Sequence, residues 1–172
     1  MKLEFAPGAL RPIDAAQMER ARREAREGPR GRAILRFHDH AEPTQRMLNA
    51  VEPGSYVRPH RHASPDKTEV FLVLSGRACL CRWSDAGELV EALEVSADGP
   101  RRGVEIPPRV WHSMVALEPG TVLFEFNEGP FSPDTHKVFA DWAPEEGSDA
   151  GRAFHERLRA RLEGAGGRAP AG

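Results

Sequence analysis

The chain has 172 residues, a length that fits one domain with a core of its own. Its 24 basic and 26 acidic residues give a formal net charge of −2, so no overall basic field favours binding to nucleic acid or to an anionic membrane. The N-terminal residues lack the apolar stretch of a signal peptide, and no run approaches the ~20 apolar residues that span a bilayer. We therefore expect a cytoplasmic protein whose partners are small molecules.

Residues 13–28 predict a helix, because they are rich in Ala, Arg and Glu, with Asp14 as the N-cap and Gly28 at the end. The interleaved acidic residues favour a solvated helix face over a nucleic-acid patch. We expect residues 1–44 to form an N-terminal helical extension and lead-in. Within it, His38 and His40 have the spacing of metal ligands, but no further candidate ligands converge on them, and hydrogen bonding in a loop is the expected role.

From Gln45 onward, short apolar runs alternate with Gly- and Pro-containing turns. Strands are expected at residues 46–52, 55–62, 69–75, 77–83, 88–95, 103–106, 112–117 and 121–126. Short strands at this spacing favour an antiparallel jelly-roll barrel over residues 45–142, in which residues 138–142 pack back against the barrel. A C-terminal helix is expected within residues 143–163, mainly over 149–163, and a disordered tail over 164–172.

Two cysteines and two tryptophans carry further expectations. Cys79 and Cys81 are same-face neighbours on an expected strand, too far apart for an ordinary disulfide, so they are expected to be reduced thiols. A metal role for the pair is the weaker alternative, because it lacks the tight turn of a zinc knuckle. Trp83 and Trp111 are expected to face outward, where a monomer would expose them, and together with the open sheet edges of a jelly roll they favour a homodimer.

The strongest chemical signal is a set of three histidines and one glutamate. His60 and His62 lie one residue apart on an expected strand, so both imidazoles point to one face. Glu69 opens the next strand and His112 follows a Pro-Pro turn, which puts all four residues at strand ends that a barrel brings together. Three imidazoles and a carboxylate suit a divalent metal, with Fe, Mn, Ni, Co and Zn all compatible. Four protein ligands leave open positions on an octahedral ion, an arrangement typical of catalytic sites.

These residues resemble the two cupin motifs. The first is matched by Gly54, His60, His62, Glu69 and Gly76, and the second by Gly103, Pro107 and His112. The chain departs from the pattern in the six residues between His62 and Glu69, in Arg109 where glycine is common, and in Ala116 where asparagine is common. The resemblance implies a mainly β fold: an antiparallel double-stranded β-helix, the RmlC-like cupin jelly-roll barrel, with an N-terminal helix and a short C-terminal helix.

A narrower resemblance covers most of the chain before the tail. Residues 45–62, 104–108, 117–125 and 142–147 are similar to the WbuC family of cupin-fold metalloproteins. That resemblance implies a small metal-binding cupin, encountered in some bacteria beside genes for O-antigen or other surface polysaccharide synthesis.

Strand alternation also suggests residues around the metal. Tyr56 and Arg58 would share the inward face of the two histidines and are the candidate catalytic residues. The guanidinium of Arg58 suits an anionic substrate, and a salt bridge at the barrel rim is the equally open alternative. Met114, Phe124 and Phe126 are expected to line the site with apolar surface.

Three classes of function follow. The first is a metal-dependent enzyme, isomerase- or epimerase-like, that acts on a sugar or sugar-nucleotide intermediate of surface polysaccharide synthesis. The second is an Fe(II)-dependent dioxygenase that uses the open metal positions. The third is a non-catalytic metal- or sugar-binding module, since a fold does not specify a function.

Overall fold

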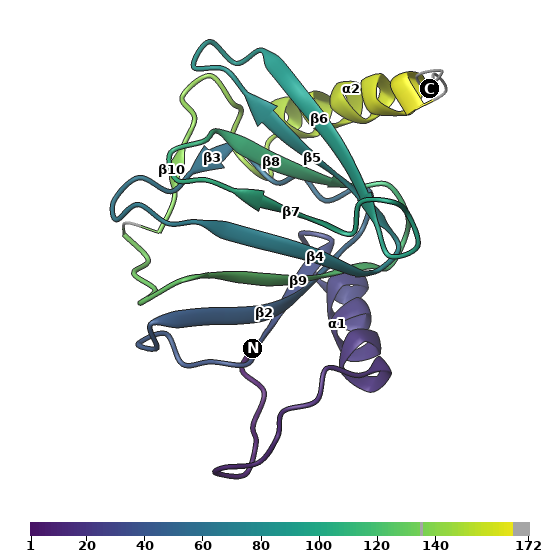
Figure 1. Ribbon diagram of the computed structural model, residues 1–172. Helices are drawn as coiled ribbons and strands as arrows, with labels where there is room; N and C mark the ends of the chain where they lie inside the picture. The colour runs from purple at the N-terminus through teal and green to yellow at the C-terminus, as the bar shows by residue number, and fades with distance from the viewer. Residues whose placement is uncertain (135, 167–172) are drawn as a thin grey trace.

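The computed structural model describes residues 1–134 and 136–166, which form two facing antiparallel sheets (Figure 1). Over these residues the first sheet contains, in spatial order, β1 (Arg32–Arg36), β2 (Thr44–Val51), β9 (Thr121–Glu128), β4 (Glu69–Ser75) and β7 (Gly103–Ile106). The second contains β10 (Val138–Phe139), β3 (His60–Arg61), β8 (His112–Ala116), β5 (Arg77–Trp83) and β6 (Leu89–Ser96). With helices near both ends, α1 (Ala15–Glu27) and α2 (Asp149–Gly166), the predicted cupin jelly-roll fold is confirmed.

Helix α1 forms as its sequence predicts and supports the first sheet from outside. The Asp14 side chain accepts a hydrogen bond from the backbone N–H of Gln17 at 3.0 Å, and Gly28 follows the last turn. Ala21 and Ala25, one turn apart, are fully buried against a cluster that includes Leu35 and Leu48. Because that face of the sheet is occupied by the helix, the opposite faces of β2 and β9 are directed into the barrel.

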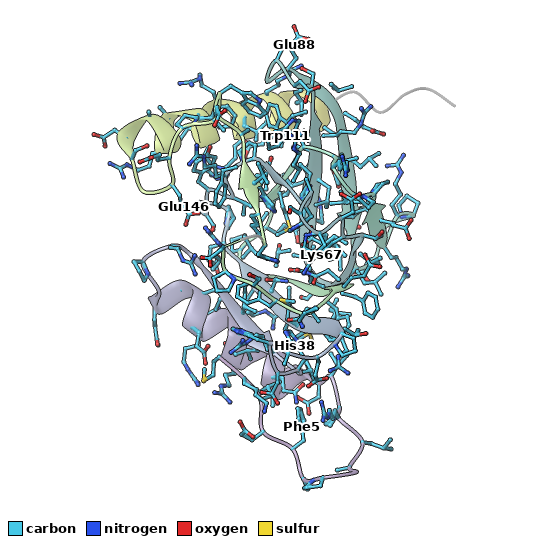
Figure 2. All side chains as sticks on the ribbon, turned by 90° about the vertical axis from the view of Figure 1, so that its left-hand side faces the viewer. Phe5, His38, Lys67, Glu88, Trp111 and Glu146 are labelled. Carbon is cyan, nitrogen blue, oxygen red and sulfur yellow. The ribbon has the colours of Figure 1, made fainter. Side chains whose placement is uncertain are left out.

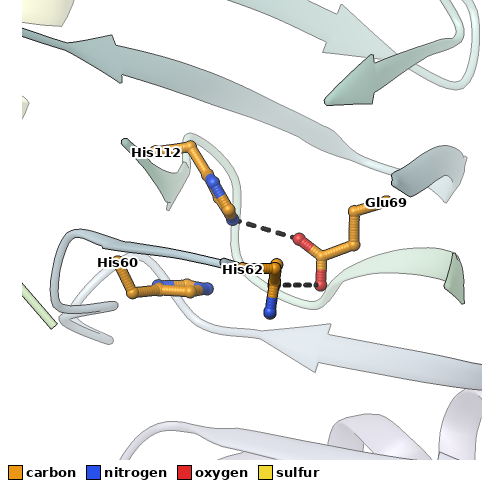
Figure 3. A group of neighbouring side chains, drawn as sticks. All are labelled: His60, His62, Glu69 and His112. Atoms are coloured by element: carbon orange, nitrogen blue, oxygen red, sulfur yellow. Dashed lines mark ion pairs between the residues drawn. The ribbon is translucent and has the colours of Figure 1, made fainter. Parts of the chain in front are cut away.

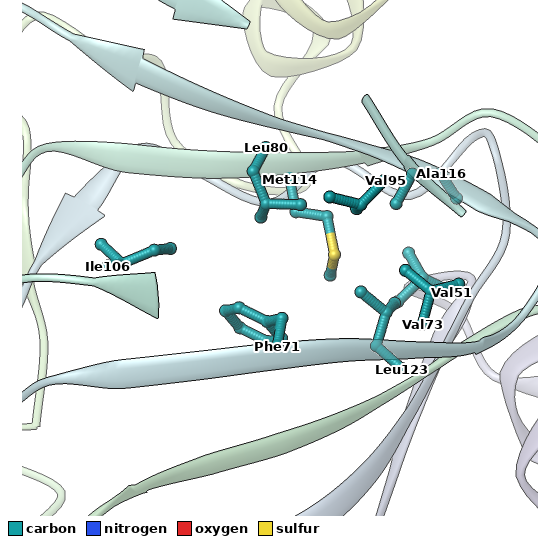
Figure 4. Packing of buried hydrophobic residues seen from close by; sticks show 10 residues of the cluster. Val51, Phe71, Val73, Leu80, Val95, Ile106, Met114, Ala116 and Leu123 are labelled. Carbon is teal, nitrogen blue, oxygen red and sulfur yellow. The ribbon is translucent and has the colours of Figure 1, made fainter. Parts of the chain in front are cut away.

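The core between the sheets lies beside the candidate metal ligands. It contains Val51, Phe71, Val73, Ala78, Leu80, Val95, Ile106, Met114, Ala116 and Leu123 (Figure 4). Phe71 and Met114 lie two positions along their strands from Glu69 and His112, so the apolar core begins where the polar site ends. This packing fixes the strands that carry two of the four ligands.

The second sheet is covered by α2 and by the segment after β10. Trp83 is buried, with ring centroids 5.6 Å from both Trp142 and Phe154. Trp111, labelled in Figure 2, is only partly exposed. The guanidinium carbon of Arg61 lies over its ring, 4.2 Å from the ring centroid. The expectation that both tryptophans are exposed on the outside is therefore wrong, because the chain itself covers them. The homodimer stays a prediction without that support.

Other expectations are met or adjusted. Residues 138–142 pack back on the barrel, since β10 pairs with β3 and Ala140 is buried. Cys79 and Cys81 are free buried thiols beneath α2, as expected.

Helix α2 extends to Gly166, three residues beyond the expected end at 163, and residues 167–172 of the expected tail lie outside the described residues. Neither described helix combines the length and the apolar character needed to cross a membrane.

Two strand assignments from sequence are wrong. Strand β1 was not expected, although its residues pair along their whole length with β2. The expected strand over 55–62 is reduced to the two residues of β3 in the described structure. Residues 55–59 instead follow an irregular path, so the alternation of inward and outward side chains does not apply to them.

Gly76 and Gly54 offer a matched test of the motif glycines. Gly76 has φ of +77°, and a Cβ there would lie 2.6 Å from Thr121 Oγ1. Gly54 has no heavy atom within 4 Å of an added Cβ. We expect Gly76→Ala to lower the free energy of unfolding by about 1–3 kcal/mol, and Gly54→Ala to change it far less. Urea unfolding of both variants measures this, and equal effects would contradict the assigned strain.

Candidate metal centre

The four predicted ligands meet inside the barrel (Figure 3). His60 in β3 lies directly opposite His112 in β8, His62 follows β3, and Glu69 begins β4 in the other sheet. One ligand atom from each residue lies within 4.8 Å of the others, and all four side chains are buried. The structure thus brings together residues that are up to 52 positions apart in sequence (60 to 112).

Backbone carbonyls orient all three imidazoles. The Nδ1 atoms of His60 and His112 each lie 2.9 Å from a carbonyl oxygen, that of Arg58 and that of Val110 respectively. The Nδ1 of His62 makes the corresponding hydrogen bond to the carbonyl of His136. Because a carbonyl oxygen only accepts, each Nδ1 carries the proton and each Nε2 keeps a lone pair. This is how histidine ligands are commonly held in metal sites.

The Nε2 atoms are where a metal would be bound. All three are buried and, within the described residues, have no hydrogen-bond partner. Glu69 Oε1 lies 3.2 Å from His62 Nε2, and Glu69 Oε2 lies 3.0 Å from His112 Nε2. Lone pairs that face each other at these distances repel, and a shared cation removes the repulsion. The arrangement of donors therefore fits a divalent ion.

The charge states also suit ligation. Burial, the largest effect, holds the pKa of His60 well below its ordinary value, so this imidazole is neutral at neutral pH. Burial raises the pKa of Glu69, but hydrogen bonds from His112 and His62, in the forms that carry a proton on Nε2, outweigh it and hold that pKa well below its ordinary value. A cation shared by the same atoms would favour the ionised carboxylate in the same way. A neutral imidazole and an ionised carboxylate are the ligating forms of these side chains.

A cavity of about 430 Å³ adjoins this group. His60, Glu69 and His112 lie on its wall, together with side chains of β1, β2 and β9 and of the segment before β10. It reaches the surface beside Met1 and Ile34, which line it and are exposed. Cavities of this size bind small molecules.

Sequence reasoning missed a polar network on the cavity wall. The side-chain amides of Asn49 and Asn127 each donate to Glu125 at 2.6 Å, and Asn127 Nδ2 also lies 3.5 Å from Glu69 Oε1. Burial, and then the charge of Glu69, raise the pKa of Glu125 to about 8. The network links the ligand carboxylate to a second, buried carboxyl group.

The faces of β9 explain the omission. Glu125 and Asn127 point into the barrel, whereas Phe124 packs in the α1 cluster and Phe126 is 42% exposed. The expectation that Phe124 and Phe126 line the site is therefore wrong, because α1 takes the apolar face. Met114 does line the cavity, as expected. Two polar residues that alternate with the phenylalanines were the signal that could have identified the inward face.

His136 is a further residue that no motif indicated. Its ring centroid lies 5.1 Å from that of His62, and its side chain lines the cavity. Burial, with Lys137 as the next cause, lowers the pKa of His136 to about 3. It belongs to the connection between β9 and β10, whose course the sequence does not specify.

The two candidate catalytic residues point elsewhere. The Tyr56 hydroxyl donates to the carbonyl of Pro144 at 3.1 Å, and its ring lies against α2, 5.7 Å from Phe154. Arg58 donates to the carbonyl of Ala140 at 3.2 Å and lies over the ring of Phe139. Neither is among the described residues that line the cavity. The predicted inward face of Tyr56 and Arg58 is wrong, because the strand on which it depended does not form there.

The second histidine pair behaves as a loop element. The Nδ1 of His38 lies 2.8 Å from the backbone nitrogen of Arg46, and the exposed His40 ring lies 4.5 Å from that of Phe131. Both residues belong to the segment between β1 and β2 and line the cavity (His38 is labelled in Figure 2). Within residues 1–134 and 136–166, the group of potential metal ligands includes neither.

Comparison with known proteins supports the fold. A family model described as a domain of unknown function (DUF6016) matches residues 13–95. A search of curated protein sequences found no significant match. CapF in complex with the inhibitor 3-isopropenyl-tropolone is 24% identical, with a TM-score of 0.53. The capsular polysaccharide assembling protein CapF from Staphylococcus aureus is 23% identical, with a TM-score of 0.50.

Each CapF match covers 62% of this chain but only 31% of CapF, so the chain spans about a third of that protein. Oxalate decarboxylase from Bacillus subtilis is 22% identical, with a TM-score of 0.45, over 58% of this chain and 24% of the decarboxylase. The narrower resemblance to WbuC proteins has no counterpart in the matching family model.

Proposed function

We propose that this protein is a metal-dependent enzyme that acts on a small polar substrate, such as a sugar or sugar-nucleotide intermediate of surface polysaccharide synthesis. The observation that carries the proposal is the group of one carboxylate and three buried Nε2 atoms that have no hydrogen-bond partner among the described residues, beside a cavity of about 430 Å³. The resemblance to WbuC proteins supports the substrate class. So does the similarity to CapF, whose name refers to capsular polysaccharide assembly.

The residues of the chain prepare the site in several ways. His60, His62, Glu69 and His112 would hold the ion, which as a Lewis acid polarises a hydroxyl or carbonyl oxygen of a substrate. The carbonyls of Arg58, Val110 and His136 fix the imidazoles, and the side chain of Asn127 holds Glu69. Apolar side chains of Met47, Phe71 and Met114 limit the water on the cavity wall.

Isomerisation or epimerisation of a sugar also needs a group that moves a proton. Beside the candidate ligands, the cavity wall offers Glu125 and His136 for this role. Their presence favours the enzyme over a purely binding module, because a binding site does not require an ionisable group at this position.

The test begins with protein purified without chelator. We expect about one equivalent of a divalent metal by elemental analysis. In D₂O, we expect NMR to show metal-dependent exchange of a carbon-bound proton in one member of a panel of sugars and nucleotide sugars. Oxygen consumption by the Fe(II) form would instead indicate a dioxygenase, and saturable binding without exchange or oxidation a binding module. Absence of stoichiometric metal would overturn the proposal.

A further inference from the structure

Four basic side chains line the cavity, and they differ in their partners. Arg32 donates to both carboxylate oxygens of Glu146 at 2.6 Å, and Arg30 lies 3.9 Å from the same carboxylate. Arg36 and Lys137 also line the cavity. Within residues 1–134 and 136–166, their side chains form no ion pair or hydrogen bond. Two basic side chains on this wall therefore lack a counter-charge from the described chain.

These two side chains lie at the edge strands of the two sheets, on the side of the barrel where the cavity lies. Arg36 ends β1, the edge strand of the first sheet, and lies in register with Met47, which is itself opposite Glu125. Lys137 directly precedes β10, the edge strand of the second sheet, where Phe139 pairs with His60. The cavity that both line also contains the metal group on its wall. An anion there can be reached from both sheets.

Lys137 follows His136, whose ring centroid lies 5.1 Å from that of the candidate ligand His62, and both residues line the cavity. The acidic groups on the described cavity wall are Glu69, a candidate ligand, and Glu125, which accepts hydrogen bonds from Asn49 and Asn127. Neither is in ion-pair contact with Arg36 or Lys137. Basic groups in such a cavity favour an anionic ligand.

The size of the cavity restricts that ligand. At about 30 Å³ for each water molecule, 430 Å³ corresponds to about 14 water molecules. A monosaccharide with one acidic group fills such a space, whereas the nucleotide part of a nucleotide sugar would extend beyond it.

We propose that Arg36 and Lys137 together bind the carboxylate or phosphate of a monosaccharide-sized anion, whose hydroxyl groups then face His60, His62, Glu69 and His112. The inference rests on the proposed function, since the anion site assigns the substrate class of the same cavity. It also replaces Arg58 as the anion-binding residue, because Arg58 is held by Ala140 and Phe139 outside the described cavity lining.

The test is calorimetric titration with glucuronate, glucose 1-phosphate, neutral glucose and inorganic phosphate, for protein with and without added Mn²⁺. We expect at least one of the two sugar anions to bind, and more tightly than glucose or inorganic phosphate. Arg36→Gln and Lys137→Met should each raise its Kd about tenfold or more, the scale of a lost hydrogen bond to a charged group. Lys137→Arg, which keeps the charge, should retain most of the affinity.

Arg101→Gln is the matched control, because it removes one positive charge from an exposed loop outside the described cavity lining. Its Kd should change less than about twofold. Circular dichroism identifies any variant that fails to fold. If Lys137→Met fails to fold, the Kd of the charge-conserving Lys137→Arg variant decides the test.

The outcomes separate this inference from the proposed function. Metal binding without affinity for either sugar anion, or equal affinity in Arg36→Gln, Lys137→Met and the control, would overturn the anion site and leave the metal assignment intact. Anion binding that depends on Arg36 and Lys137 in a protein that takes up no metal would retain the anion site and overturn the proposed function. Equal affinity for inorganic phosphate would overturn the monosaccharide part of the inference.

Discussion

Replacing His60 and His62 together by Ala is expected to abolish stoichiometric metal binding. The two imidazoles supply two of the three buried Nε2 atoms that lack a partner in the described structure, and the remaining Glu69 and His112 cannot enclose an ion alone. Elemental analysis after dialysis against a competing chelator measures the effect. We expect about one equivalent in the wild type and less than about a tenth in the double variant.

The chain offers a control with the same spacing. His38 and His40 are also one residue apart, but they lie outside the metal group in the described structure. His38→Ala with His40→Ala should therefore keep the metal, although loss of the contact between His38 and Arg46 lowers stability. A His60/His62 double variant that still carries one equivalent would show that the ion is bound elsewhere.

The metal-free protein is expected to be most stable near pH 7 and to lose stability in acid. Burial lowers the pKa values of His38, His60, His136 and His155 in the folded state. Below about pH 6.5 the unfolded chain therefore binds more protons than the folded chain, so the free energy of unfolding falls with pH. For His136 this effect extends from pH 6.5 down to about 3. Each such histidine contributes up to about 1.4 kcal/mol per pH unit.

Glu125 acts in the opposite direction. Its pKa of about 8 in the folded state exceeds the ordinary value of 4.5, so its contribution to stability falls as pH rises between these values. At pH 6.5 each histidine of the unfolded chain is half protonated, so four histidines outweigh this one carboxyl up to about pH 7. Above that pH, Glu125 dominates. Urea unfolding of chelator-treated protein at constant ionic strength between pH 5 and 8 measures both slopes.

Two variants test which residues cause the two slopes of the free energy of unfolding against pH. His136→Gln should reduce the acid slope, and Glu125→Gln should reduce the alkaline one. A free energy of unfolding that rises steadily from pH 7 to 5 would contradict the assignment of neutral buried histidines.

The sequence predicted most strands and the four residues of the candidate metal group because both depend on local patterns. Glu69 begins an apolar run bounded by Gly76, and His112 follows two prolines. Each of these candidate ligands therefore stands where local sequence signals also mark the start of a strand. Helix α1 was predictable for the same reason, since its cap and its end are both local. Where a residue's role depends on its own neighbours in sequence, a single sequence is sufficient to predict that role.

The rest of the site depends on which face of a strand the remainder of the chain covers. On β9, both faces have residues that could be buried, and packing of α1 decides that Phe124 points away from the site and Glu125 toward it. Residues 55–59 look like a strand, yet in the described structure only His60 and Arg61 find pairing partners there. His136 and Lys137 reach the site through a connection that no short pattern specifies.

The position of the ligands has a mechanical consequence for the barrel. Glu69 belongs to the first sheet, whereas His60 and His112 belong to the second and His62 follows one of its strands. At the side where the cavity lies, β1 and β10 end their respective sheets without pairing to each other in the described structure. A bound ion would therefore clamp the two halves of the barrel together, so that opening this side requires its release. Metal content would then set how cooperatively the two sheets unfold.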